Sequence, residues 1–181
     1  MKKMLLLFTG AALFTACNNE TKSKSEATGS DTTAVKSSVT LPYTPDYSSS
    51  FKIGNPEYSA MILQGSWKDW ENNTMDNMKS WIADTILAFH SDNVMTMGVD
   101  SLQARWKRGR AGYTSVIDTV HAVMPTYSTD KNENWVLVWA KEINTDTKGK
   151  IDTMELMETW RINKDGKADR LYQYDRHTRK Q

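Results

Sequence analysis

The sequence is poor in the side chains that most often bind metals or form cross-links, with one cysteine and three histidines among 181 residues. A single cysteine, Cys17, excludes a disulfide bond within the chain. The three histidines are scattered and show no HExxH spacing, and there is no CxxC pair, which argues against a zinc site. A glycine-rich phosphate loop and a GxSxG nucleophile elbow are also missing. We therefore expect no metal and no cofactor.

An excess of charge of one sign is lacking as well. The chain has 23 lysines and arginines against 22 aspartates and glutamates. The first 16 residues contain two of the lysines and no acid, so the remainder carries a net charge near −1. This balance gives no electrostatic reason to expect a nucleic-acid partner.

The N-terminus, MKKMLLLFTGAALFTAC, has the pattern of a targeting segment. Lys2 and Lys3 precede an apolar run over residues 4–16 that is shorter than the roughly 20 residues needed to span a bilayer. FTAC resembles the lipobox of bacterial lipoproteins, which implies signal cleavage before Cys17 and acylation of its thiol. The alternative is an ordinary secretory signal with an incidental cysteine. The first interpretation predicts a protein anchored by lipid to a bacterial envelope membrane, facing the periplasm or the cell exterior.

A polar segment follows the cysteine, and residues 18–50 contain 14 serines or threonines among 33 positions. Such a composition buries too little apolar surface to offset the entropy lost on ordering. We predict three regions: a signal peptide over residues 1–16, a lipidated cysteine with a disordered tether over 17–53, and one folded domain over 54–181.

The first part of the predicted domain has helical periodicity. Asn55 can cap a helix that Pro56 begins, and apolar residues then recur at helical spacing over residues 56–72. A second, shorter helix is predicted from Met75 to Ile82. Asp100 can cap a third that runs to about Arg110.

The apolar period changes to two after these helices. Strands are predicted over residues 114–124, 135–143, 152–162 and 168–176, joined by turns of which Asp165-Gly166 is a strong hairpin signal. Helices followed by successive hairpins indicate an α+β fold, with the helices packed on one face of an antiparallel sheet.

Three stretches of the sequence, MDNMKSWIADTILAFHSD, GVDSLQARW and WRINKDGKADRLYQYD, resemble parts of the nuclear transport factor 2-like superfamily, especially its SnoaL-like branch. The resemblance spans residues 55–176 and implies that the sheet curves strongly into a cone that encloses a pocket. The family usually has two acids where this chain has Asp84-Thr85. The resemblance also implies two functions that remain open: ligand binding, or acid–base chemistry of the isomerase, cyclase or dehydratase type.

Asp84 and His90 attract an acid–base interpretation, but their spacing argues against a local pair. On a strand, six residues separate them by about 20 Å. Asp92 is close to His90 but lies in Ser91-Asp92-Asn93, which is typical of a turn. His90 is therefore a candidate only as a partner of a group from elsewhere in the chain.

Glu158 interrupts an apolar strand face, because Met154, Leu156, Trp160 and Ile162 share its parity. An inward carboxylate is costly unless it is paired or hydrogen-bonded, and such sites often carry function. We consider Glu158 and His90 the catalytic candidates. The structural alternative for Glu158 is a carboxylate at a wet pocket mouth or paired with Arg161 or Arg170.

Aromatic side chains supply the candidate pocket lining. These are Trp67, Trp70, Trp81 and Trp106 on the predicted helices and Tyr172 and Tyr174 on the last strand. The function we prefer from the sequence is non-catalytic binding of a small hydrophobic or amphipathic ligand, with a homodimer formed through the outer sheet face. A SnoaL-like enzyme is the second possibility. A protein-interaction module that uses Trp135 and Trp139 on one strand face is the third.

Overall fold

The computed structural model describes residues 41–177, which belong to one compact unit of the chain. The predicted signal peptide, Cys17 and most of the predicted tether lie outside these residues. The helical segments are α1 (Pro56–Ile62), η1 (Leu63–Lys68), α2 (Asp69–Asn72), η2 (Met75–Asn77), α3 (Met78–Trp81) and α4 (Val99–Arg110). The strands are β1 (Phe51–Ile53), β2 (Ile82–Phe89), β3 (Met95–Met97), β4 (Tyr113–Ser128), β5 (Glu133–Asp146), β6 (Ile151–Ile162) and β7 (Ala168–His177).

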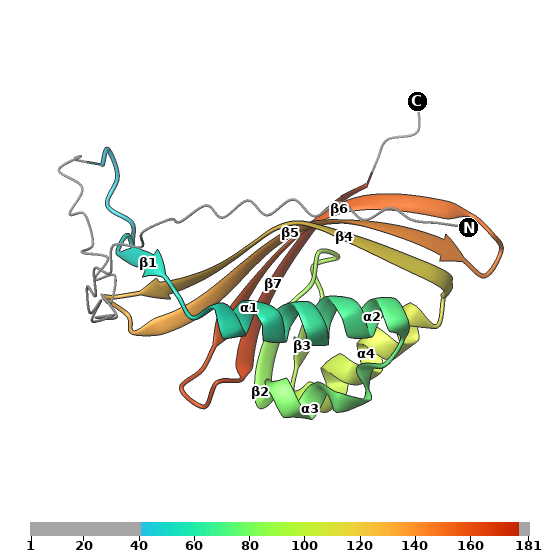
Figure 1. Cartoon of the computed structure of the whole chain (residues 1–181), viewed down its shortest axis with the longest axis horizontal. Coiled ribbons are helices and arrows are strands. Elements are labelled where there is room, and N and C mark those ends of the chain that lie inside the picture. Colours follow the sequence, from blue (N-terminus) through green and yellow to red (C-terminus); the bar gives the residue numbers. More distant parts are fainter. Residues whose placement is uncertain (1–40, 178–181) are drawn as a thin grey trace, which may run out of the picture. The chain divides into compact units, whose positions relative to one another are not determined.

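The seven strands form one curved sheet in the order β1-β4-β5-β6-β7-β2-β3, and the helices lie on one of its faces (Figure 1). This arrangement confirms the α+β prediction. The four long strands β4 to β7 form successive hairpins, and the turn after β6 contains Gly166 at a positive φ of 76°. None of the helices in residues 41–177 is long and apolar enough to cross a membrane.

One strand pair departs from the predicted antiparallel sheet. Five of the six pairings are antiparallel, but β2 runs parallel to β7. The predicted pattern followed hairpins, whereas β2 lies between β7 and β3 in the sheet and precedes α4 in the chain. No turn joins β2 directly to β7, so a hairpin pattern does not predict this pairing.

The long first helix begins and ends where the sequence predicts, but its middle is widened. The Asn55 side chain accepts a hydrogen bond from the backbone N–H of Glu57 at 3.0 Å and caps α1. The segment η1 is a π-helix between α1 and α2, and a π-helical turn changes the direction of the side chains that follow. Helical periodicity alone does not reveal such a turn.

The predicted cap of the third helix is wrong. Helix α4 begins at Val99 after Gly98, which has a φ of 81° and makes no side-chain capping bond. Asp100 lies inside the first turn, where its negative charge favours the helix dipole, and it pairs with Lys79 at 2.8 Å.

Ordered structure begins earlier than the predicted boundary at residue 54. Residues 51–53 form β1, which pairs with the end of β4, Phe51 opposite Ser128. Just before it, the Ser48 hydroxyl donates to Asp130 at 2.6 Å, and Tyr47 packs edge-on against Trp135 with ring centroids 6.1 Å apart. A strand of only three residues is too short to show a period of two, and its backbone partners come from the edge of β4, distant in the sequence.

The core lies between the helices and the inner face of the sheet. Ile62 from α1, Leu102 from α4, Val138 from β5 and Trp160 from β6 are completely buried there. The inner residues of each strand alternate with outward ones, as the period of two predicts.

Candidate functional site

Glu158 lies on the inner face of β6 and is only 3% exposed. Its Oε2 accepts hydrogen bonds from the Trp160 indole at 2.9 Å and the Ser66 hydroxyl at 3.3 Å, and its Oε1 accepts one from Gln173 at 2.9 Å. A carboxylate has about four acceptor positions, so one remains for a ligand. The inward orientation matches the sequence analysis, but neither Arg161 nor Arg170 pairs with Glu158.

Burial raises the pKa of Glu158 above its ordinary value, and the nearby Glu142 charge acts in the same direction. The three hydrogen-bond donors oppose this shift because they favour the ionised form. The result is a fixed carboxyl group with an increased affinity for a proton.

His90 follows β2 directly and is buried. Its Nε2 lies 3.0 Å from the Thr96 hydroxyl, and a hydrogen bond with Gln173 tends to raise its pKa. Burial and the charge of Arg105 prevail, so the pKa of His90 is lowered and the ring is neutral near pH 7. Gln173 thus contacts both Glu158 and His90, and this is how the structure brings the two candidates together.

Asp84 and Asp92 take no part in this arrangement. Asp84 is exposed and lies between Ile82 and Leu87, where the pairing of β2 with β7 is irregular. Asp92 accepts a hydrogen bond from the backbone N–H of Val94 at 3.1 Å, a turn role, and pairs with Arg105 at 2.6 Å.

A cavity of about 440 Å³ lies between the helices and the inner face of the sheet. Glu158 and His90 both line it, and this volume is in the range of small-molecule sites. The other lining residues come from the first helix, α4 and β4 to β7: Ser66, Trp67, Trp70, Arg105, Trp106, Arg108, Gly109, Tyr113, Glu142, Met154, Leu156, Gln173 and Asp175. The lining mixes aromatic, aliphatic and charged groups, so the site is amphipathic and not mostly apolar.

The π-helix η1 supplies two of the lining residues, Ser66 and Trp67. The residue before them, Gly65, lies against the Trp81 ring, and a Cβ atom there would come within 2.3 Å of it. The absence of a side chain at Gly65 therefore lets η1 pack closely against Trp81 at the end of α3. π-Helical turns are frequent at functional sites, which fits its position here.

The aromatic candidates divide into two groups. Trp67, Trp70 and Trp106 line the cavity, whereas Trp81 packs in the core against Trp160 with ring centroids 5.5 Å apart. The indole Nε1 of Trp67 is buried, in a residue 5% exposed, and has no hydrogen-bond partner among the described residues. Trp67 therefore lines the cavity with its ring and keeps its N–H buried.

The placement of Tyr172 and Tyr174 in the pocket needs a correction. They alternate with Leu171 and Gln173, which face inward, so both tyrosines lie on the outer face of the sheet. Tyr172 stacks on Phe89 with ring centroids 5.1 Å apart. The two tyrosines line a separate hollow of about 310 Å³ that also touches His90 and Gln173.

Sequence reasoning missed a pair of acids on the inner face. Asp118 of β4 and Glu142 of β5 lie directly opposite each other across the two strands. A bulge at His121 makes this possible, because the register shifts by one residue between Val120 and Ala122. Alternation with Val138 and Ala140 could have placed Glu142 inward, but the register could not be read from the sequence.

The two carboxyl groups interact closely enough to share a proton. Burial raises the pKa of Asp118 to about 8, and the charges of Glu142 and Glu71 contribute. Burial also raises the pKa of Glu142, although Asn144 and the Trp70 indole donate to it at 2.6 Å and 2.8 Å. Glu142 lines the cavity, so this pair forms a second polar region beside the one at Glu158.

Comparison with known proteins adds information about the fold alone. No family profile and no curated protein sequence matches the chain. Solved structures do match. An NTF2-like protein from Exiguobacterium sp. 255-15 is 15% identical with a TM-score of 0.54, and the match covers 65% of this chain and 99% of that one.

Two further structures are similar. A Delta 5-3-ketosteroid isomerase from Mycobacterium sp. is 16% identical with a TM-score of 0.52, over 67% of this chain and 98% of the other. A candidate SnoaL-like polyketide cyclase from Jannaschia sp. CCS1 is 12% identical with a TM-score of 0.52, over 66% and 83% of the two chains. The described part of the chain therefore has the cone-shaped NTF2-like fold, as the sequence resemblance implied. At these identities the likeness carries no residue role.

Proposed function

We propose that the cavity binds a small amphipathic ligand and that this is the function of the folded part of the chain. The supporting observation is a cavity of about 440 Å³ in which polar groups, among them Glu158 and His90, lie beside aromatic and aliphatic walls. This volume is in the range of small-molecule sites, and the mixed lining suits a ligand with both polar and apolar parts.

A direct test is the binding of 3-phenylpropan-1-ol, a soluble probe with one apolar and one hydrogen-bonding end, measured by titration calorimetry on the full chain. Leu156→Trp fills the cavity from β6 and should abolish binding. Leu137→Trp, the same substitution at a half-buried residue on the outer side of the neighbouring strand, is the matched control and should bind normally. Binding that survives Leu156→Trp would place the probe elsewhere and contradict the proposal.

Acid–base catalysis is the second candidate, and one arrangement favours it. A carboxyl with raised pKa and a neutral imidazole both face the cavity and are joined through Gln173. Proteins with this fold include a ketosteroid isomerase and a candidate polyketide cyclase. For a ligand that the wild type converts, Glu158→Gln should abolish turnover and leave binding within a few fold, whereas equal turnover would exclude Glu158 as the proton-transferring group.

We also propose that Cys17 anchors the chain by lipid to a bacterial envelope membrane, with residues 18–50 as the tether. The N-terminal pattern of two lysines, an apolar run and FTAC supports this location. A ligand site held near a membrane suits a hydrophobic or amphipathic ligand.

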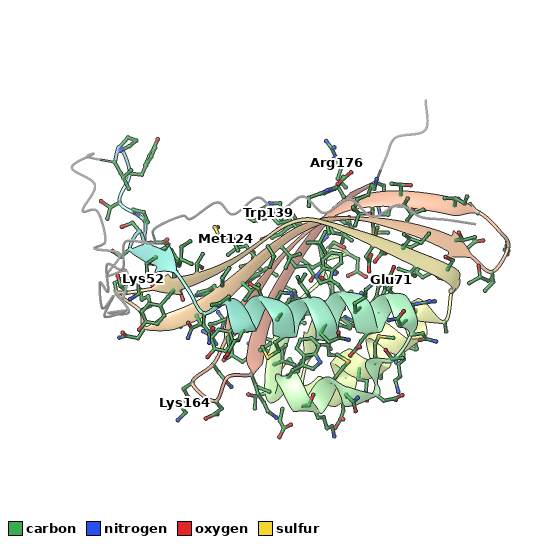
Figure 2. The ribbon with its side chains drawn as sticks, viewed as in Figure 1. Lys52, Glu71, Met124, Trp139, Lys164 and Arg176 are labelled. Atoms are coloured by element: carbon green, nitrogen blue, oxygen red, sulfur yellow. The ribbon has the colours of Figure 1, made fainter. Side chains whose placement is uncertain are left out.

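The outer face of the sheet is a proposed surface for self-association. It carries the exposed side chains of Ile117 and Met124, and Met124 and Trp139 point away from the helices (Figure 2). Apolar patches of this kind often mark protein interfaces. A Trp139→Glu variant should sediment with a lower dimer fraction than the wild-type chain, and equal sedimentation would exclude this surface.

A further inference from the structure

Exposed apolar side chains gather at the end of the sheet where β1 lies. Among residues 41–177, thirteen large apolar or aromatic side chains are exposed, and five of them belong to residues 41–53: Leu41, Tyr43, Tyr47, Phe51 and Ile53. Single exposed apolar residues are ordinary, whereas a group of neighbouring ones marks a contact surface. We call these five residues the N-terminal patch.

The segment that carries the patch is held on the fold by its polar groups. The backbone carbonyl of Ser50 accepts hydrogen bonds from the N–H and the hydroxyl of Thr129 at 2.8 and 3.0 Å. The Tyr47 ring packs against Trp135, which is only 8% exposed. Polar groups of this segment therefore bind inward, while most of its apolar side chains remain in the solvent.

The patch lies at one end of the sheet and not over its centre. Phe51 and Ile53, 47% and 72% exposed, alternate with Lys52 and so point to the same side of β1. Residues 41–50 rise from β1 at this end (Figure 1). Figure 2 shows Lys52 there, with Trp139 well separated from it along the sheet.

Tyrosines and lysines accompany the apolar groups. The Lys131 ammonium lies 5.7 Å from the centroid of the Tyr47 ring, and the Lys52 ammonium lies 5.3 Å from that of Tyr127. Tyrosine is enriched at the level of lipid headgroups, where a lysine can bury its stem and keep its ammonium in water. Protein interfaces are instead depleted in lysine. The composition therefore fits the boundary between water and lipid.

Charge contributes little to such a contact. Lys52 and Lys131 are matched by Asp46 and Asp130 in the same part of the fold. The attraction therefore comes from burying apolar side chains at the lipid boundary, which does not require anionic lipid.

We propose that the N-terminal patch docks on the surface of the bilayer in which Cys17 is anchored. The inference rests on the proposed lipid anchor and specifies which surface of the fold meets the lipid. The sequence that carries Cys17 joins the described residues at Leu41, which is itself part of the patch. A surface attached in this way meets the bilayer at a high effective concentration, so a few exposed side chains are sufficient.

Site-specific quenching tests the docking on the full chain, purified from its host with its lipid and reconstituted into phosphatidylcholine vesicles. Cys17 is the only cysteine, so after acylation an introduced cysteine is the only free thiol. Ile53→Cys is labelled with bimane. The control is Ile151→Cys, 62% exposed at the start of β6, and Figure 1 shows the turn between β5 and β6 at the end of the sheet opposite β1.

A phospholipid with a nitroxide near its headgroup is the quencher. The bimane at position 53 should lose about half of its fluorescence or more, because docked apolar groups lie about 5–10 Å into the headgroup boundary. The bimane at position 151 should lose none. Adding Phe51→Glu to Ile53→Cys should remove the quenching, whereas Tyr174→Glu, at an exposed aromatic residue outside the patch, should leave it unchanged.

The outcomes separate the docking from the anchor. An acylated, vesicle-bound chain whose two labels are quenched equally, or not at all, refutes the docking and leaves the anchor in place. If mass spectrometry finds no acyl group on Cys17, the anchor fails and the docking fails with it. If Phe51→Glu lowers the dimer fraction in detergent and leaves the quenching intact, the patch serves self-association and the docking is overturned.

Discussion

At the residue scale, ionisation of the buried Asp118 carboxyl lowers the stability of the fold. Its carboxyl has a pKa of about 8 in the fold against an ordinary 3.8, because it is buried beside Glu142. A group that binds its proton more tightly in the folded chain stabilises the fold where it is protonated. This contribution is complete below about pH 4 and disappears as the pH rises to about 8.

The Asp118→Asn variant should therefore be more stable than the wild type at pH 8, because a neutral amide can donate to Glu142 as the protonated acid does. After allowance for partial exposure, the gain in the free energy of unfolding should be about 1–2 kcal/mol. Urea denaturation at pH 5 and pH 8 measures it. A variant that is less stable at pH 8, with the wild-type slope against pH, would contradict the assigned pKa.

Trp67 allows a second test at this scale. Trp67→Phe removes one of the two fused rings from the wall of the cavity, so affinity for 3-phenylpropan-1-ol should fall by about 1 kcal/mol, or roughly fivefold, through lost apolar contact. Trp81→Phe is the control, since Trp81 also has an unpaired Nε1 but does not line the cavity. Equal losses in the two variants would mean that the loss of affinity comes from disturbed core packing and not from the wall of the cavity.

At the element scale, the π-helix η1 joins the fold to the site, because Ser66 and Trp67 reach the cavity from it. Gly65 permits the close contact of η1 with Trp81. Gly65→Ala should destabilise the protein by about 1–3 kcal/mol through overpacking, although alanine is the better helix former. Thermal unfolding measures this, and a neutral or raised melting temperature would show that the Trp81 ring can move aside.

The strands show what the sequence could and could not predict. Alternation placed Glu158 inward correctly, because its apolar neighbours share its parity on an unbroken strand. It failed for the acid pair, because the bulge at His121 changes which residues of β4 face Glu142. Tyr172 was misplaced since nothing in its own strand distinguishes the inner from the outer face. Pairings that depend on bulges, or that join strands with no turn between them, such as β2 with β7, are not encoded in local periodicity.

At the scale of the whole molecule, the lipid anchor proposed at Cys17 would precede one NTF2-like fold. Cys17→Ala should abolish acylation and the signal cleavage that follows it, leaving a precursor heavier by the signal peptide. Mass spectrometry of the membrane fraction distinguishes the two products. A Cys17→Ala chain that is cleaved as in the wild type would indicate an ordinary secretory signal.

The central claim is that the cavity holds a small amphipathic ligand, and native mass spectrometry of the full chain, purified from the membranes of its own host, tests it most directly. The wild-type protein and Leu137→Trp should each carry one bound molecule that disappears on denaturation. The cavity-filling Leu156→Trp protein should carry none. An unliganded wild type, or a ligand that remains on Leu156→Trp, would contradict the claim.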